Sequence, residues 1–191
     1  MNNLELILPE IFISLSIMFL LILGVFKKNS SNLIQNLSLI VLLITAVITF
    51  NETLSSNETL LFNNSIIIDY FSSFMKIITL LSAFLVLIIS SSYLKTMKIF
   101  KIEYPILILS SVLGMLIMIS SNDLIVFYMG LELQSLALYV LATFNRDQIK
   151  SSEAGLKYFV LSALSSGLLL YGCSLIYGFT GSTNFNLIAS Q

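Results

Sequence analysis

The sequence predicts an all-α membrane protein with about six transmembrane helices. Of its 191 residues, 57% are hydrophobic and 10% are charged, and the mean hydropathy is +0.98, whereas a soluble domain carries roughly 25% charged residues. The apolar residues gather in six runs, and the basic residues fall in alternate loops between these runs. These three observations exclude a soluble globular protein.

The six runs approach the roughly 20 residues that a helix needs to cross the hydrocarbon core of a bilayer. The predicted spans are residues 7–26, 33–50, 71–93, 105–120, 124–144 and 154–177. The first opens with Pro9 and Glu10, in the turn where a proline costs little because its missing N–H would be unpaired anyway. It ends at Lys27 and Lys28.

The connections between the spans differ in length. Residues 51–64 form the longest polar connection, whereas the three residues 121–123 between the fourth and fifth spans predict a tight antiparallel hairpin. Ser151, Ser152 and Glu153 precede the sixth span, and these residue types predict an N-cap and first turn there.

Seven of the nine basic residues lie in three alternate loops. They are Lys27, Lys28, Lys95, Lys98, Lys101, Arg146 and Lys150. Under the positive-inside rule these loops face the cytoplasm or the mitochondrial matrix, and both termini face the intermembrane space or the periplasm.

The composition also restricts the chemistry of the chain. Histidine is absent, Cys173 is the single cysteine, and the net charge is −1. Imidazole catalysis, a thiolate metal cluster and a basic surface for nucleic acid are therefore excluded. We expect no cofactor, metal or redox centre in this chain.

Glu132 is an acid well inside a predicted span. It lies roughly 12 Å from the turn before the fifth span, too deep for its carboxyl to reach the membrane surface. A charge at the centre of a membrane helix costs at least about 2.5 to 3.5 kcal/mol and marks function by default. The alternative is a carboxyl that fixes packing by bonding to a neighbouring helix.

Tyr128, Ser135 and Tyr139 share one helix face with Glu132. The four residues are spaced by four, three and four positions, so at 100° per residue they fall within about 60° of one another. Hydroxyls beside a buried carboxyl can hold waters and pass a proton along the helix. We call these four residues the polar stripe.

Lys157 and Lys76 are the two basic residues inside predicted spans. Lys157 lies about 5 Å into the sixth span, so it fits either a proton relay or a boundary lysine whose ammonium reaches the interface. Along the helix axes it is some 13 Å from Glu132, which argues against a direct ion pair. Lys76, two turns after Asp69, is expected to be an interfacial anchor.

Two segments carry a family resemblance. They are FYMGLELQSL at residues 127–136 and SEAGLKYF at residues 152–159, and the opening LPE at residues 8–10 agrees with them. The sequence resembles the chain 2, or subunit N, family of antiporter-like subunits in respiratory complex I, the NADH:ubiquinone oxidoreductase. The resemblance implies proton translocation driven by distant NADH oxidation, with Glu132 and Lys157 at positions of functional residues.

The resemblance also implies what the chain lacks. Family members have about fourteen helices with two inverted repeats, so residues 1–103 match the first three helices and residues 104–191 match helices four to six of the first repeat. The cation expected beside Glu132 then belongs to missing helices. Either a second polypeptide supplies them or the chain is a truncated product, and the unpaired acid favours the second polypeptide.

The expected partners follow from the resemblance to the subunit N family. They are the other membrane subunits of complex I, a second chain carrying the remaining helices, and membrane lipids, in the mitochondrial inner membrane or, alternatively, a bacterial plasma membrane. Two rival functions stay open: a cation/proton antiporter outside the respiratory chain, and a non-transporting scaffold.

Overall fold

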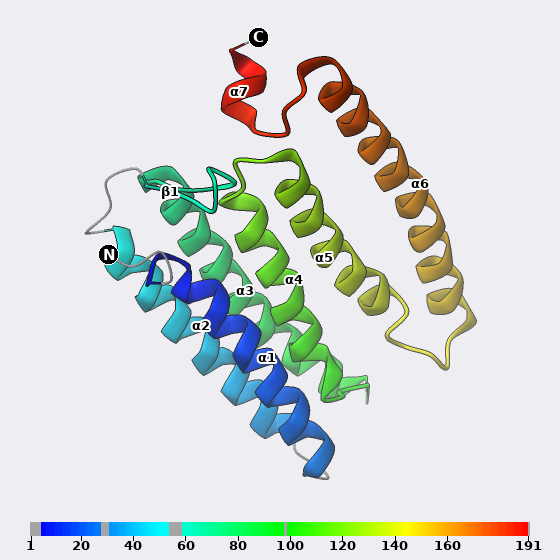
Figure 1. The fold of residues 1–191 in the computed structure, drawn as a ribbon. Helices are drawn as coiled ribbons and strands as arrows, with labels where there is room; N and C mark the ends of the chain where they lie inside the picture. The colour runs from blue at the N-terminus through cyan, green and yellow to red at the C-terminus, as the bar shows by residue number, and fades with distance from the viewer. Residues whose placement is uncertain (1–4, 28–30, 54–58, 98, 191) are drawn as a thin grey trace.

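A computed structural model describes residues 5–27, 31–53, 59–97 and 99–190. Within these residues six long helices run back and forth, each returning beside the one before it (Figure 1). They are α1 Leu8–Phe26, α2 Ser31–Thr53, α3 Tyr70–Thr96, α4 Glu103–Ile119, α5 Leu124–Ala142 and α6 Ile149–Thr180. Each predicted span overlaps one helix, so the all-α membrane fold is confirmed.

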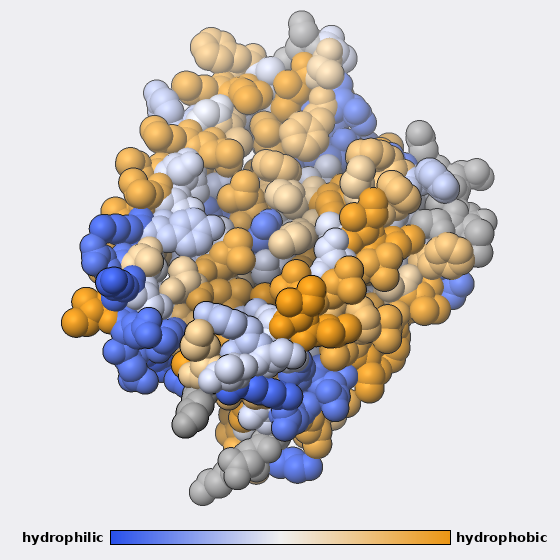
Figure 2. Space-filling model, turned by 180° about the vertical axis from the view of Figure 1, so that it is seen from behind, coloured by the Kyte–Doolittle hydropathy of each residue, from blue (hydrophilic) through white to orange (hydrophobic). Residues whose placement is uncertain are grey.

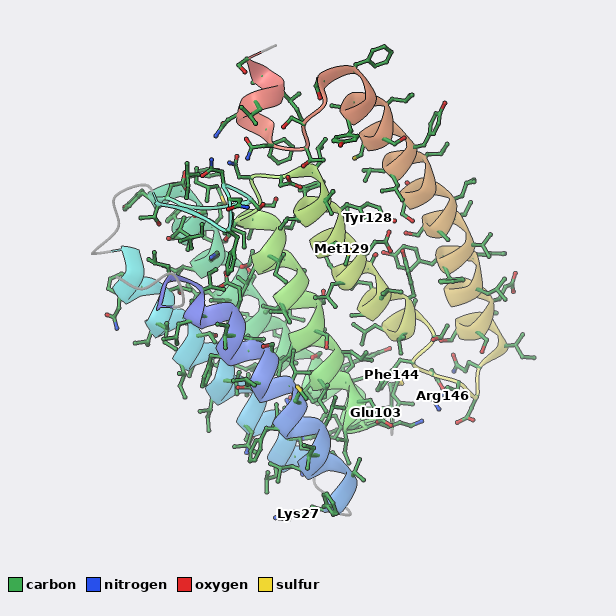
Figure 3. All side chains as sticks on the ribbon, viewed as in Figure 1. Lys27, Glu103, Tyr128, Met129, Phe144 and Arg146 are labelled. Carbon is green, nitrogen blue, oxygen red and sulfur yellow. The ribbon has the colours of Figure 1, made fainter. Side chains whose placement is uncertain are left out.

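The helix bundle has two distinct ends. The described residues at the α1–α2, α3–α4 and α5–α6 connections share the lower end in Figure 3, where the basic residues Lys27 and Arg146 are labelled. We call this the basic end. The opposite end holds the 3-10 helix η1 Glu5–Ile7, the strands β1 Thr59–Leu61 and β2 Ile66–Ile68, and the short helix α7 Phe185–Ala189 (Figure 1). We call it the hairpin end.

Five helices in the described part of the chain, all the long ones except α4, have the length and composition to cross a membrane. Helix α4 is apolar but has 17 residues, about 26 Å at 1.5 Å per residue, against a hydrocarbon core of about 30 Å. Figure 2 shows hydrophobic residues over most of one face and hydrophilic residues gathered mainly toward the basic end. This distribution suits a surface that contacts lipid.

The apolar core lies among α1, α2, α3 and α4. Its fully buried members include Ile13, Ile34, Leu80 and Leu109, one from each helix. Helices α5 and α6 contribute no residue to this described core, and Gly155 is the one residue of α6 that is buried. Helix α6 therefore packs on α5 at the edge of the bundle (Figure 1).

The polar connection expected at residues 51–64 is partly structured. Helix α2 continues to Thr53, and β1 pairs antiparallel with β2 in the register Thr59↔Ile68, Leu60↔Ile67 and Leu61↔Ile66. The expectation of one long loop was wrong because apolar residues lie within this segment and directly after it: Leu61 and Ile68 pack on Leu6. Residues 54–58 lie outside the described part of the chain.

The tight turn expected between α4 and α5 is present, and it is tied to its neighbours. Asp123 caps α5, with its Oδ1 accepting from the Ile125 N–H at 2.8 Å, and its Oδ2 accepts a hydrogen bond from the Thr183 hydroxyl. The Asn64 carbonyl accepts from the side-chain amides of Asn122 and Asn184, at 2.9 and 2.8 Å. These bonds fix the start of α5 against the β-hairpin and the segment before α7.

Helix α6 begins earlier than expected. Its N-cap is Gln148, which makes no side-chain capping bond, so the expected cap at residues 151–153 lies inside the helix. The prediction was wrong because no proline or glycine interrupts residues 149–153, and polar residues continue a helix beyond its apolar part. The helix ends at Thr180 and is capped by Gly181, whose φ of 67° is the left-handed conformation that glycine adopts freely.

Candidate functional site

Glu132 is the ninth residue of α5 and is half-buried. Its Oε1 atom is shielded from solvent and has no hydrogen-bond partner among the described residues. A buried polar atom without a partner costs about 1 to 3 kcal/mol, and more for a charged group. The carboxyl is therefore incompletely satisfied by the part of the chain that the structure describes.

Close contact between α4 and α5 sets the direction in which Glu132 faces. A Cβ placed on Gly130 would lie 2.9 Å from the Met118 nitrogen and 3.0 Å from the Gly114 oxygen, so the two backbones touch here. Glu132 is two residues further along, which turns its side chain about 200° around the helix. The carboxyl thus lies on the face of α5 turned away from α4.

Tyr139 connects that face to α6. Its hydroxyl donates a hydrogen bond to Ser162 Oγ at 2.5 Å, and its ring makes edge contacts with Tyr158 and Phe159 at centroid distances of 4.9 and 5.6 Å. Tyr139 is buried. The Tyr139 end of the polar stripe is therefore buried between α5 and α6.

The other two members of the stripe differ in their surroundings. Ser135 is buried, and its hydroxyl donates to the Glu132 backbone carbonyl at 3.1 Å. Tyr128 is half-buried and lies on the α6 side of α5 in Figure 3. The hydrogen bonds made by Ser135 and Tyr139 do not include the Glu132 carboxyl, so a relay along the stripe stays a prediction.

Lys157 lies on the outer surface of α6. Its side chain is 67% exposed, and its Nζ donates to Glu153 Oε1 at 2.6 Å, one turn earlier on the same helix. Because α6 begins at Ile149, Lys157 is the ninth residue of its helix instead of lying in the first turn. Its ion pair with Glu153 agrees with the expectation that it does not pair directly with Glu132.

The expectation for Lys76 was wrong. Its side chain is 1% exposed, and its Nζ lies 2.5 Å from Glu10 Oε1 on α1. An interfacial lysine keeps its ammonium in water, whereas this one is enclosed and paired. Asp69 is instead the N-cap of α3, with its Oδ1 accepting from the Ser72 N–H at 2.7 Å.

The Glu10–Lys76 pair was not among the sequence predictions, although the sequence carries a signal for it. Glu10 and Lys76 lie in the first two turns of α1 and α3, and two helices separated by one antiparallel helix begin at the same end of a bundle. Opposite charges at a similar depth in two such spans predict an ion pair. Taken singly, Glu10 fits a first-turn residue and Lys76 fits an interfacial anchor, so neither residue alone indicates the pair.

Residues that could hold a metal are not gathered anywhere in the described ranges: no group of three or more His, Cys, Asp or Glu side chains occurs there. Cys173 is half-buried on α6 and is a free thiol.

Curated sequences match almost the whole chain. It is 71% identical over 188 residues to NADH-quinone oxidoreductase subunit N of Pelagibacter ubique. The matched residues make up 98% of this chain and 40% of that protein. Subunit N of Bartonella bacilliformis is 52% identical over 188 residues, with 98% and 38% covered. The chain is similar in sequence to part of subunit N. It spans about 40% of the length of the curated subunit N sequences that it matches.

A family description matches the C-terminal part of the chain, and two solved structures share its fold. The description "NADH:quinone oxidoreductase/Mrp antiporter, TM" matches residues 121–191. A chain of respiratory complex I from Thermus thermophilus superimposes with a TM-score of 0.78 at 26% identity, covering 92% of this chain and 38% of that one. A chain of an archaeal membrane-bound sulfane sulfur reductase has a TM-score of 0.80 at 22% identity, covering 99% and 40%, and shows the shared fold.

Proposed function

We propose that this chain is a membrane subunit of a proton-pumping NADH:quinone oxidoreductase and that Glu132 takes up and releases the translocated proton. The observation that carries the proposal is the shielded, unpartnered Oε1 of Glu132, on the face of α5 turned away from the packed α4 contact. An ionisable group held in a membrane span without a partner marks a transport path by default. The homology to subunit N supplies the reaction that such a path would serve.

The partner of Glu132 is proposed to lie outside this chain. An ionised carboxyl in hydrocarbon needs a compensating cation or water, and the chain covers 40% of its subunit N relative. The exposed apolar face of α6, with Leu161, Leu164 and Leu168 each more than 60% exposed, would pack against the remaining helices of the subunit. Other membrane subunits and lipids would cover the rest.

Lys157 is proposed as a second group of this path, with the boundary lysine as the alternative. Its ammonium is exposed and can rotate away from Glu153, because surface ion pairs hold their partners weakly. It would contact Glu132 through waters or through residues that another polypeptide brings.

For its location we propose a bacterial plasma membrane, with the basic end in the cytoplasm and the hairpin end in the periplasm. The relatives on which this rests are bacterial, and they give no support to the mitochondrial inner membrane that the sequence first suggested.

The test is proton pumping by the complex that contains this chain, reconstituted in vesicles. Glu132→Gln keeps the shape of the side chain but cannot exchange a proton, so we expect a fall in protons moved per NADH oxidised. The matched control is Glu103→Gln, an exposed acid at the basic end, which should pump as the unmodified complex does. Unchanged pumping in the Glu132 variant would refute the proposal.

A cation/proton antiporter outside the respiratory chain is the second candidate, favoured by the family description, which also names the Mrp antiporter. The complex purified through this chain separates the two, since the respiratory function requires NADH oxidation by that complex. A scaffold without transport predicts a further result: Glu132→Leu should then be harmless or stabilising, because it removes an unpaired polar group.

A further inference from the structure

A second site with unsatisfied polar atoms lies at the hairpin end, apart from Glu132. Glu10 is 8% exposed, and while its Oε1 accepts from Lys76, its Oε2 is shielded and has no partner among the described residues. Ser120, the C-cap of α4, is 2% exposed, and its hydroxyl is also shielded without a partner among the described residues. Buried polar atoms in proteins nearly always have a partner, which is ordered water where no protein group is available.

Both residues line one pocket. It lies between α1 and α4 beside β2 and has a volume of about 310 Å³. Glu10, Ser14 and Ser120 supply its polar groups, and the rest of its wall is apolar, including Ile66 and Ile117. A water molecule occupies about 30 Å³ in the liquid, so the pocket has room for several.

We propose that this pocket holds water bonded to Glu10 Oε2 and Ser120 Oγ, and that Glu10 exchanges protons with this water at the hairpin end. Water that reaches both atoms satisfies the two groups that the described protein atoms leave unpaired. The pocket is partly open and lies beside the first turn of α1, so protons can enter it from the surface at the hairpin end without crossing the apolar core.

The exchange step balances with water as the co-reactant. A hydronium in the pocket transfers its proton to Glu10 Oε2, one O–H bond breaks and one forms, and neutral water and a carboxylic acid remain. Lys76 on α3 is the charged side chain that faces Glu10, while the pocket-lining residues from η1, β2 and α4 are uncharged.

This inference does not depend on the proposed function, because exchange at Glu10 can be followed without turnover. The test is infrared spectroscopy of membranes that contain the full complex, titrated with acid in H₂O and in D₂O. We expect a carboxyl band on acidification that shifts in D₂O and is lost in Glu10→Gln. In Ser120→Ala the band should change frequency, since one partner of the water is gone.

A pair of size variants tests the water itself. Ile117→Phe fills the pocket and leaves the Glu10–Lys76 pair untouched, so the band should exchange with D₂O more slowly. Leu85→Phe adds the same bulk on the exposed face of α3, where Leu85 is 57% exposed, and should leave exchange unchanged. Absence of a Glu10 band, or a band indifferent to Ile117→Phe, would overturn the proposal. If the complex with Glu10→Gln fails to assemble, the D₂O exchange of the carboxyl band in the two size variants tests the proposal.

Discussion

Lys76 Nζ donates a hydrogen bond to Glu10 Oε1 at 2.5 Å and so joins α1 to α3 across 66 residues of sequence. Both side chains are at least nine-tenths buried. In this buried environment each charge compensates the other, and the pair holds the two helices in one register. Removing one partner leaves an uncompensated buried charge, whereas removing both does not.

A double-mutant cycle on this pair is therefore expected to be strongly non-additive. Lys76→Met should destabilise the chain by about 3 to 5 kcal/mol, and Glu10→Gln should also destabilise it. The double variant should lose less than the sum of the two. The measurement is the free energy of unfolding in detergent for the four forms. Additive losses would mean that the two side chains do not interact in the folded chain.

The contact of Gly114 with Gly130 gives a second prediction. A methyl group on Gly130 would meet backbone atoms of Met118 and Gly114 at 2.9 to 3.0 Å, and backbone cannot move aside without separating α4 from α5. We expect Gly130→Ala to destabilise the chain by about 1 to 3 kcal/mol and to lower pumping by moving Glu132. The control is Gly167→Ala on α6, where the added methyl meets nothing within 4 Å. Equal stability of the two variants would contradict the close contact.

The sequence predicted the helices well because charges and polar residues bound each apolar run. The α4–α5 turn was predictable for a local reason: residues 121–123 are too few to leave any other connection. The face shared by Tyr128, Glu132, Ser135 and Tyr139 also follows from local spacing, since 100° per residue fixes which residues point together.

The remaining features depend on which helices meet. The burial of Lys76 could not be read from α3 by itself, because its partner belongs to α1. The close approach at Gly130 needs the position of α4, and the Tyr139–Ser162 bond needs the position of α6. The proposed cation partner of Glu132 could not be predicted from α5 alone for the same reason, since no described residue bonds to its Oε1.

Tyr139 allows the proton path to be separated from packing. Tyr139→Phe removes the hydroxyl that donates to Ser162 but keeps the ring contacts with Tyr158 and Phe159, so the stability loss should be about 0.5 to 1.5 kcal/mol. If the polar stripe relays protons, pumping should fall further than this loss explains. Tyr171→Phe is the control, since Tyr171 is 63% exposed on α6. Equal pumping by both variants would remove Tyr139 from the path.

Lys157 provides the test that ranks the two candidate groups. Lys157→Met breaks an exposed pair with Glu153, and pairs of this kind contribute about 0.3 to 0.5 kcal/mol, so the chain should stay folded and assembled. We expect its loss of protons pumped per NADH to be smaller than that of Glu132→Gln, because Glu132 Oε1 is shielded without a partner among the described residues, while the lysine is exposed and paired. Lys150→Met, in the first turn of the same helix, controls for the lost positive charge. A larger effect at Lys157 than at Glu132 would reverse the ranking and make the lysine the main proton-exchanging group of this chain.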